Sequence, residues 1–236
     1  MRTLRLGHWL AMALILPSAA LFAQNRSPRT SQSELRLHIQ PSPAIHRSVP
    51  AVVWLEPMGD TLVLSFTPQG HYTLLQKNRT FIPHLQVVPV GSVVQFPNAD
   101  PFFHNVFSLF DGKRFDLGLY EAGSTKSVTF SRSGVSYIFC NIHPEMSAVV
   151  ISLSTPLYAI ADANNALIIR NIPPGDYRMR LWVEGALPTA LQGASREIHL
   201  PPGNTDLGDI NVPIATTATH SNKFGNAYDR QPTSPY

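Results

Sequence analysis

The stretch Gly134-Val-Ser-Tyr-Ile-Phe-Cys-Asn-Ile-His-Pro-Glu-Met146 decides what this chain folds around. It holds the only cysteine, Cys140, which is followed by His143 and Met146 in a C-x-x-H-x-x-M arrangement. The residues before the cysteine alternate with a period of two, which predicts a half-buried strand. A thiolate, an imidazole and a thioether so close together suit a soft or borderline transition metal. The stretch therefore indicates a strand that ends in a metal-binding loop.

A second imidazole would complete a particular kind of site. One thiolate, two imidazoles and a weakly bound methionine are the ligands of a blue-copper electron-transfer centre. The best candidate for the second imidazole is His104, in Asn98-Ala-Asp-Pro-Phe-Phe-His-Asn-Val-Phe107. We expect the side chains of His104, Cys140, His143 and Met146 to converge on one point and to bind one type 1 copper ion.

Other interpretations of the same residues stay open. A lone buried cysteine is more often a small apolar residue than a ligand, but the spacing to His143 and Met146 favours ligation. Met146 could be a packing residue, with Glu145 or a backbone oxygen in the axial position. Asn105 is a candidate hydrogen-bonding link between the two ligand segments, and Asn98 a candidate brace for the strand of His104.

Aromatic and apolar residues near the candidate ligands have two possible roles. Phe102, Phe103, Ile142 and Pro144 could form an apolar rim around an exposed edge of His143. For Phe103, as for Phe107, packing in the core is the preferred expectation.

Several stretches carry a resemblance to the plastocyanin-like cupredoxins: Phe81-Ile-Pro83, Val87-Val-Pro-Val-Gly-Ser-Val-Val-Gln-Phe-Pro-Asn98, His104-Asn105 and Cys140 to Met146. The short ligand loop, with Pro144 directly after the second histidine, is most similar to that of amicyanin. The longer string FPNADPFFHNVFS…FDLGLY…FCNIHPEMSAVVISL resembles cupredoxin-containing proteins known as methylamine utilisation proteins, a name that does not establish methylamine as a substrate. The resemblance implies a Greek-key cupredoxin β-sandwich over residues 67–155.

Composition agrees with an all-β protein and excludes several classes. The chain has 236 residues, enough for one or two domains, with 44% hydrophobic and 14% charged residues, 21 prolines and many short β-branched runs. The net charge is only +3 and no cluster of Lys and Arg resembles a nucleic-acid-binding stripe. A single cysteine excludes an intrachain disulfide, a multi-thiolate zinc or iron–sulfur site and the two-cysteine binuclear copper centre.

The N-terminus has the pattern of an export signal over residues 1–23. Arg2 and Arg5 form a basic segment, residues 10–16 an apolar one, and Leu21-Phe-Ala23 a cleavage site. The alternative is an uncleaved anchor, but the apolar run is short and Pro17 interrupts it, which disfavours a membrane-spanning helix. We expect a periplasmic protein with no stable membrane insertion.

Residues 156–213 predict a second β-sandwich. Strands are expected at 158–162, 167–172 and 177–182, with tight turns at Asn164-Asn165 and Pro173-Pro-Gly175. This pattern resembles the carboxypeptidase regulatory-like (prealbumin-like) sandwich, and Ala51-Val-Val-Trp-Leu55 resembles one of its early strands.

The order of these segments suggests an insertion. Residues 34–66, with strands expected at 35–39, 51–55 and 61–66, would pair with residues 156–213, and the cupredoxin would be inserted between them. The alternative is two consecutive domains, with the early strands in the cupredoxin. Residues 214–236 have no periodicity and predict a disordered tail.

The sequence favours an electron carrier over an enzyme. A catalytic copper site would need further ligands and an open position, and the other histidines form no paired motif. A one-electron carrier would need a redox partner protein, such as a dehydrogenase or a c-type cytochrome. The alternatives are periplasmic copper binding and delivery, which exchangeable Met-rich or His-rich ligands would favour, and a structural binding sandwich in which copper is incidental.

Overall fold

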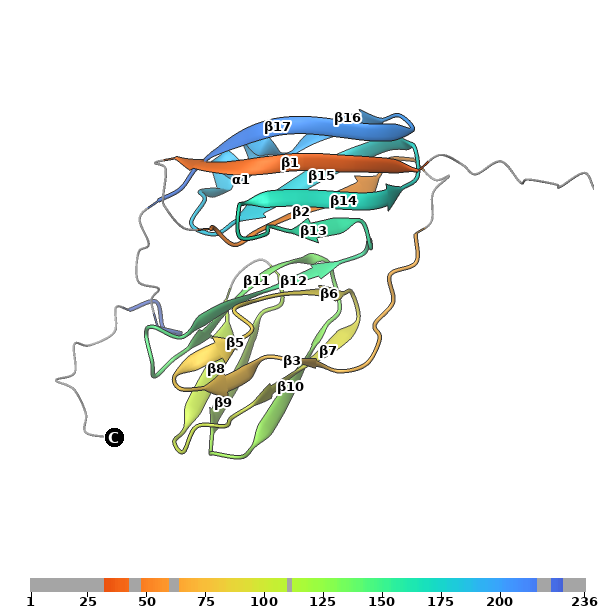
Figure 1. Ribbon diagram of the computed structural model, residues 1–236. Helices are drawn as coiled ribbons and strands as arrows, with labels where there is room; N and C mark the ends of the chain where they lie inside the picture. Colours follow the sequence, from red (N-terminus) through yellow and green to blue (C-terminus); the bar gives the residue numbers. More distant parts are fainter. Residues whose placement is uncertain (1–31, 43–47, 60–63, 110–111, 216–221, 227–236) are drawn as a thin grey trace, which may run out of the picture. The chain divides into compact units, whose positions relative to one another are not determined.

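The computed structural model describes residues 32–42, 48–59, 64–109, 112–215 and 222–226 (Figure 1). Its elements there are strands, apart from one short helix, so the predicted all-β fold class is confirmed. The signal peptide expected at 1–23 lies outside these residues. The strands are β1 (Ser33–Ser42), β2 (Ala51–Pro57), β3 (Tyr72–Thr73), β4 (Leu75–Lys77), β5 (Thr80–Ile82), β6 (Leu85–Pro89), β7 (Ser92–Pro97), β8 (His104–Ser108), β9 (Phe115–Tyr120), β10 (Thr125–Phe130), β11 (Gly134–Cys140), β12 (Ser147–Leu153), β13 (Tyr158–Ile160), β14 (Ala166–Ile172), β15 (Gly175–Val183), β16 (Arg196–Leu200) and β17 (Gly203–Pro213).

The candidate ligands belong to a sandwich built from strands β3 to β12. A five-stranded sheet in the order β6-β12-β11-β8-β9 packs on a three-stranded sheet in the order β10-β7-β3. Strand β12 is central, between β6 and β11, as its near-continuous apolar run predicts. The core between the two sheets contains Phe96, Phe130, Ile138, Cys140 and Met146, all fully buried.

Strand β11 has the alternation that its sequence predicts. Ser136, Ile138 and Cys140 are buried on its inner face, whereas Tyr137 and Phe139 are only partly buried on the outer face. In its antiparallel pairing with β8, Cys140 lies opposite Val106. This register brings the end of β11 beside the start of β8, where His104 lies.

A second sandwich surrounds the first one in sequence. Sheet β14-β1-β17 packs on sheet β13-β2-β15-β16, over a core that includes Leu35, Leu55, Tyr177 and Met179. Strand β2 comes before residue 67, yet it pairs with β13 and β15, which follow residue 155. The insertion of residues 67–155 into a split second sandwich stays a proposal, and this pairing supports it.

A third apolar layer separates the central sheets of the two sandwiches. Val52 and Trp182 of the second sandwich pack against Val149, Ile151 and Leu153, on the outer face of the five-stranded sheet. The indole N–H of Trp182 donates to the hydroxyl of Tyr137 at 3.0 Å. The outer face of β11 and β12 is thus covered by the chain's own second sandwich.

Three details differ from the sequence expectations. The strand expected at 61–66 is not formed by residues 64–66, which have no strand pairing, and 61–63 lie outside the described residues. The short helix α1 (Pro188–Ala194) was not predicted; in the described part of the chain no helix is long and apolar enough to span a membrane. The expectation of a disordered tail does not extend to Asn222–Asn226, which form a hydrogen-bonded turn.

Candidate metal centre

Two neighbouring strands and one tight loop hold the candidate ligands. His104 begins β8, Cys140 ends β11, and His143 lies in the loop that follows. Two backbone hydrogen bonds close this loop: the amide of Met146 donates to the carbonyl of His143 at 3.0 Å, and the amide of Cys140 donates to the carbonyl of Met146 at 3.2 Å. The loop therefore has little freedom to move His143 away from Cys140.

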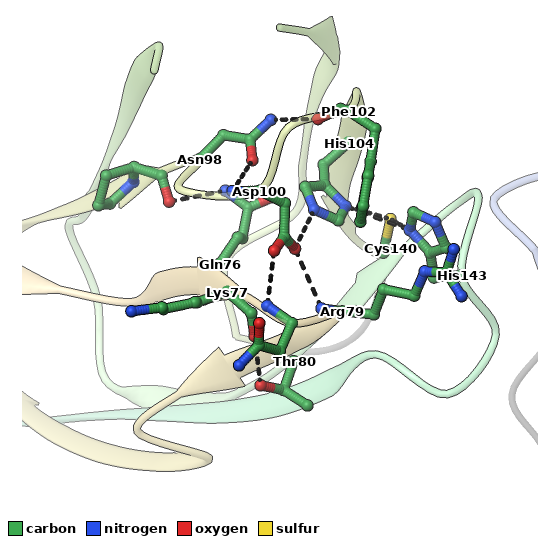
Figure 2. Close-up of polar contacts among 12 residues, drawn as sticks. Gln76, Lys77, Arg79, Thr80, Asn98, Asp100, Phe102, His104, Cys140 and His143 are labelled. Carbon is green, nitrogen blue, oxygen red and sulfur yellow. Dashed lines mark hydrogen bonds and ion pairs between the residues drawn. The ribbon is translucent and has the colours of Figure 1, made fainter. Parts of the chain in front are cut away.

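Three donor atoms converge at the end of the sandwich, as Figure 2 shows for His104, Cys140 and His143. The Sγ of Cys140 lies 3.6 Å from Nδ1 of His104 and 3.6 Å from Nδ1 of His143, and the two nitrogens are 3.2 Å apart. His104 and Cys140 are fully buried and His143 is partly exposed. The predicted convergence holds for these three side chains.

This triangle has the dimensions of a metal site. Its circumcentre lies about 2.0 Å from all three atoms, and metal–ligand distances to imidazole nitrogen and thiolate sulfur are about 2.0 to 2.3 Å. A trigonal set of two imidazoles and one thiolate is the arrangement of blue-copper centres. Met146 is fully buried in the same apolar cluster as Cys140. Its role as an axial ligand stays a proposal.

The tautomer of His104 follows from its hydrogen bond to Asp100. Nε2 of His104 lies 3.0 Å from Oδ2 of Asp100, and both side chains are buried. A carboxylate can only accept, so Nε2 carries the proton. In the neutral ring Nδ1 is then a lone pair, and it faces Cys140.

Asp100 is held in turn by a hairpin. Strands β4 and β5 are joined by Asn78-Arg79, both with positive φ (54° and 57°), as in a type I′ turn. Their amides donate to Oδ1 and Oδ2 of Asp100 at 2.6 and 3.0 Å. Figure 2 shows the carboxylate between this turn and His104.

Burial shifts the pKa values of the donor groups in opposite directions. Burial lowers the pKa of His104, although Asp100 opposes the shift, and burial together with the neighbouring His104 lowers the pKa of His143. Both imidazoles therefore favour the neutral form that binds metals. Burial raises the pKa of the Cys140 thiol, so a bound cation is needed to hold it as a thiolate.

The rim of the site is apolar and carries one cation. The ring of Phe102 lies 5.3 Å from that of His104 and 5.4 Å from that of His143, and the guanidinium of Arg79 lies 5.3 Å above Phe102. Phe103 is 52% exposed and Ile142 43% exposed, so the expectation that Phe103 packs in the core is wrong. Phe103 lies between a bend at residues 100–102 and the start of β8.

Asn98 has the bracing role that was expected, whereas Asn105 links the ligand segments through its backbone and not its side chain. Asn98 braces the loop before β8, donating to the carbonyl of Phe102 at 2.8 Å and accepting from the amide of Asp100 at 3.0 Å. The link between the ligand segments is the backbone carbonyl of Asn105, which accepts from the amide of Asn141 at 2.9 Å. The side chain of Asn105 instead donates to Asp116.

Comparisons with known proteins give likenesses of fold only. No family model and no curated protein match the chain. Solved structures similar to part of it include a copper-containing nitrite reductase from Thermus scotoductus SA-01, with 23% identity over 42% of this chain and 25% of that chain at a TM-score of 0.34. Another is a purple cupredoxin from Nitrosopumilus maritimus, with 23% identity over 36% of this chain and 100% of that chain at a TM-score of 0.32. A third is a Cu(I) form of a mutant amicyanin, with 20% identity over 36% of this chain and 83% of that chain at a TM-score of 0.34. The chain thus spans a quarter of the nitrite reductase, and likenesses this weak leave the chemistry to be inferred from the side chains.

Proposed function

We propose that this chain is an exported type 1 copper protein that carries one electron at a time. The observation that supports it most is the largely buried triangle of one sulfur and two Nδ1 atoms. His104, Cys140 and His143 would hold the copper, with Met146 as the weak axial ligand. When bound, copper would supply a reversible one-electron couple, tuned by the axial ligand and by the apolar surroundings of the sulfur.

The surroundings of the site favour electron transfer over turnover of a substrate. Two of the three donors are fully buried, and in the described residues no further His, Cys, Asp or Glu joins the cluster. His143 is the partly exposed donor, beside the apolar residues Phe102 and Ile142. An electron would therefore enter and leave at this edge, where a redox partner protein, a dehydrogenase or a c-type cytochrome, would dock.

The test is copper binding followed by visible spectroscopy. The purified chain should bind one Cu(II) and develop an intense blue or purple absorption from thiolate-to-copper charge transfer. Cys140→Ser should abolish this absorption, whereas His199→Gln, at an exposed histidine paired with Asp176, should leave it unchanged. The proposal is wrong if the chain binds no copper or if the absorption survives in C140S.

Chelator competition separates a carrier from a delivery protein. A carrier keeps its copper for hours against a mild chelator and cycles between oxidation states by voltammetry. Rapid release to the chelator would favour copper delivery instead.

Export rests on residues 1–23 and is tested separately. The mature protein should begin at Gln24 and appear in the periplasmic fraction, as intact mass and cell fractionation would report. A full-length chain in the cytoplasm would contradict export.

A further inference from the structure

The C-terminal part of the chain returns to the candidate metal centre as a short turn, Asn222–Asn226. The side-chain oxygen of Asn222 accepts from the amides of Phe224 and Asn226, both at 3.0 Å. The backbone closes the same turn, from the amide of Asn222 to the carbonyl of Asn226 at 2.8 Å. The turn is thus a self-contained unit, drawn as the short blue stretch near β11 and β12 in Figure 1.

One residue of this turn, Lys223, makes two contacts with the first sandwich, which holds the candidate ligands. Its amide donates to Oδ1 of Asn141 at 2.9 Å, and its ammonium donates to Oδ2 of Asp116 on β9 at 2.8 Å. Asn141 is the residue directly after Cys140. A segment that follows the second sandwich in sequence is therefore hydrogen-bonded to the loop that begins directly after Cys140.

The second contact reaches the strand of His104. The other oxygen of Asp116 accepts from the side-chain amide of Asn105 at 2.7 Å. Asn105 is the residue directly after His104, and its carbonyl accepts from the amide of Asn141. Lys223, Asp116, Asn105 and Asn141 thus form a closed ring of hydrogen bonds that joins the residues following two of the candidate ligands.

The charges in this ring are matched. Burial alone would raise the pKa of Asp116, but hydrogen bonds from Lys223, Asn105 and the amide of Gly118 outweigh it and lower the pKa. The carboxylate is therefore ionised near neutral pH and faces the ammonium of Lys223. The side chains of Lys223 and Asp116 are 24% and 42% exposed, so salt should weaken their attraction.

We infer that Lys223 is a positioning residue. Through its two contacts, the turn 222–226 holds the start of β8 and the end of β11 together, so that His104 and Cys140 keep their relative positions. The inference deepens the proposed copper function, on which its relevance rests. Its first test uses metal-free protein, so that the positioning role of Lys223 and the proposed copper function can be refuted separately.

The first test measures access to the only cysteine. In metal-free protein, the rate at which Cys140 reacts with a thiol reagent should rise about two- to fivefold in Lys223→Met, as expected for loss of a partly exposed ion pair. A chain that ends at Ala215 loses both contacts and should react faster still. A chain that ends at Asn226 keeps the turn and serves as the matched control, and Lys223→Arg should restore most of the protection.

Salt provides an independent check on the same variants. Added salt should speed labelling of the unaltered chain and change K223M little, because the variant has no ion pair to screen. Equal labelling rates in the unaltered chain, K223M and the chain ending at Ala215 would overturn the inference. So would a faster rate in the chain ending at Asn226, which would assign the effect to residues beyond the turn.

The copper-loaded protein gives the last readout. In K223M the charge-transfer band should shift and broaden as the Cys140–His104 placement loosens, while a variant that merely lost global stability would keep its band below its unfolding temperature. An unchanged band together with unchanged labelling would refute a positioning role.

Discussion

His104 shows how a candidate ligand is prepared for a metal by a hydrogen-bonded partner that is not itself a ligand. Its Nε2 is fixed as a donor by Asp100, which leaves Nδ1 as the lone pair toward Cys140. Asp100 can do this because the amides of Asn78 and Arg79 already neutralise part of its charge. The orientation of His104 thus depends on Asp100, and the orientation of Asp100 depends on the turn at Asn78-Arg79.

Replacing Asp100 tests this dependence. Asp100→Asn keeps the size of the side chain but places an NH₂ group either against the amide of Asn78 or against the amide of Arg79 and Nε2 of His104, where only acceptors fit. We expect copper affinity to fall about 10- to 100-fold, the usual cost of losing a partner of a metal-ligating histidine. Competition with a chelator of known affinity measures it, and Asp162→Asn, at an exposed turn of the second sandwich, is the control. An unchanged affinity would show that His104 orients itself without Asp100.

The sequence could predict the candidate metal-binding donors but not the residues that orient them. C-x-x-H-x-x-M is a local pattern, and its spacing alone places Cys140 and His143 in one loop. The contact of Asp100 with His104 depends on how the loop from residue 98 folds back through the Asn98 hydrogen bonds, which no spacing rule encodes. The contact of Lys223 with Asp116 could not be predicted either, because the two residues are 107 positions apart in sequence.

At the scale of elements, the β4–β5 hairpin is unusual for its turn residues. A type I′ turn needs positive φ at both central positions and commonly has Gly at the second, but here that residue is Arg79, with φ of 57°. An L-residue in this region costs about 1–2 kcal/mol. The compensating contact is the guanidinium over Phe102, beside both histidine rings.

Two substitutions of Arg79 separate the backbone cost from the side-chain gain. Both Arg79→Gly and Arg79→Ala lose the contact with Phe102, but only glycine relieves the backbone. We therefore expect R79G to be more stable than R79A by about 1 kcal/mol, once the entropy of glycine is allowed for. Urea unfolding measures the difference. If R79A were the more stable of the two, the left-handed conformation of the turn would not be a source of strain.

Strand prediction worked best where burial leaves a clear pattern in the sequence. The apolar run of β12 was predicted because burial on both faces of a sheet favours continuous apolar residues, and the alternation of β11 because burial on one face favours a period of two. The turn at Asn164-Asn165 was predicted for the right reason, since Asn165 has φ of 62°. Strand β17 was missed because most of its eleven residues are exposed and its few large apolar residues do not alternate regularly. Its position is set by parallel pairing with β1, which is distant in sequence and which local sequence does not show.

At the largest scale, three apolar layers connect the four larger sheets of the described residues. The middle layer, with Trp182 and Ile151 fully or almost fully buried, joins the two sandwiches. Its residues occupy the outer faces of strands, and the sequence patterns did not assign these faces to a contact between the two sandwiches. Period-two patterns do not distinguish an outer face that meets solvent from one that meets another sheet, so this layer could not be predicted.

A charged pair lies beside this layer and makes stability depend on pH. His84, just before β6, has Nδ1 3.0 Å from the carbonyl of Ser147 and Nε2 2.5 Å from a carboxylate oxygen of Glu184, which follows β15. Both partners are acceptors, so the ring is best satisfied when both nitrogens carry protons. The hydrogen bond to Glu184 raises the pKa of His84, against the opposing effect of burial.

The sign of the pH effect follows from that direction. Because the pKa of His84 is higher in the folded state than in the unfolded one, the pair stabilises the fold fully below the unfolded value of about 6.5 and loses this contribution as pH rises through the folded value. Glu184→Gln removes the carboxylate, so the stability advantage of the unaltered chain over E184Q should be largest near pH 6 and should shrink towards pH 9. Urea unfolding of the two metal-free chains at several pH values measures this difference, and the exposed pair His199–Asp176 provides D176N as a control. The side chains of His84 and Glu184 are 41% and 35% exposed, so the advantage should also diminish with salt. An advantage that grew with pH would mean that His84 is neutral in the folded chain and that Glu184 is held by other contacts.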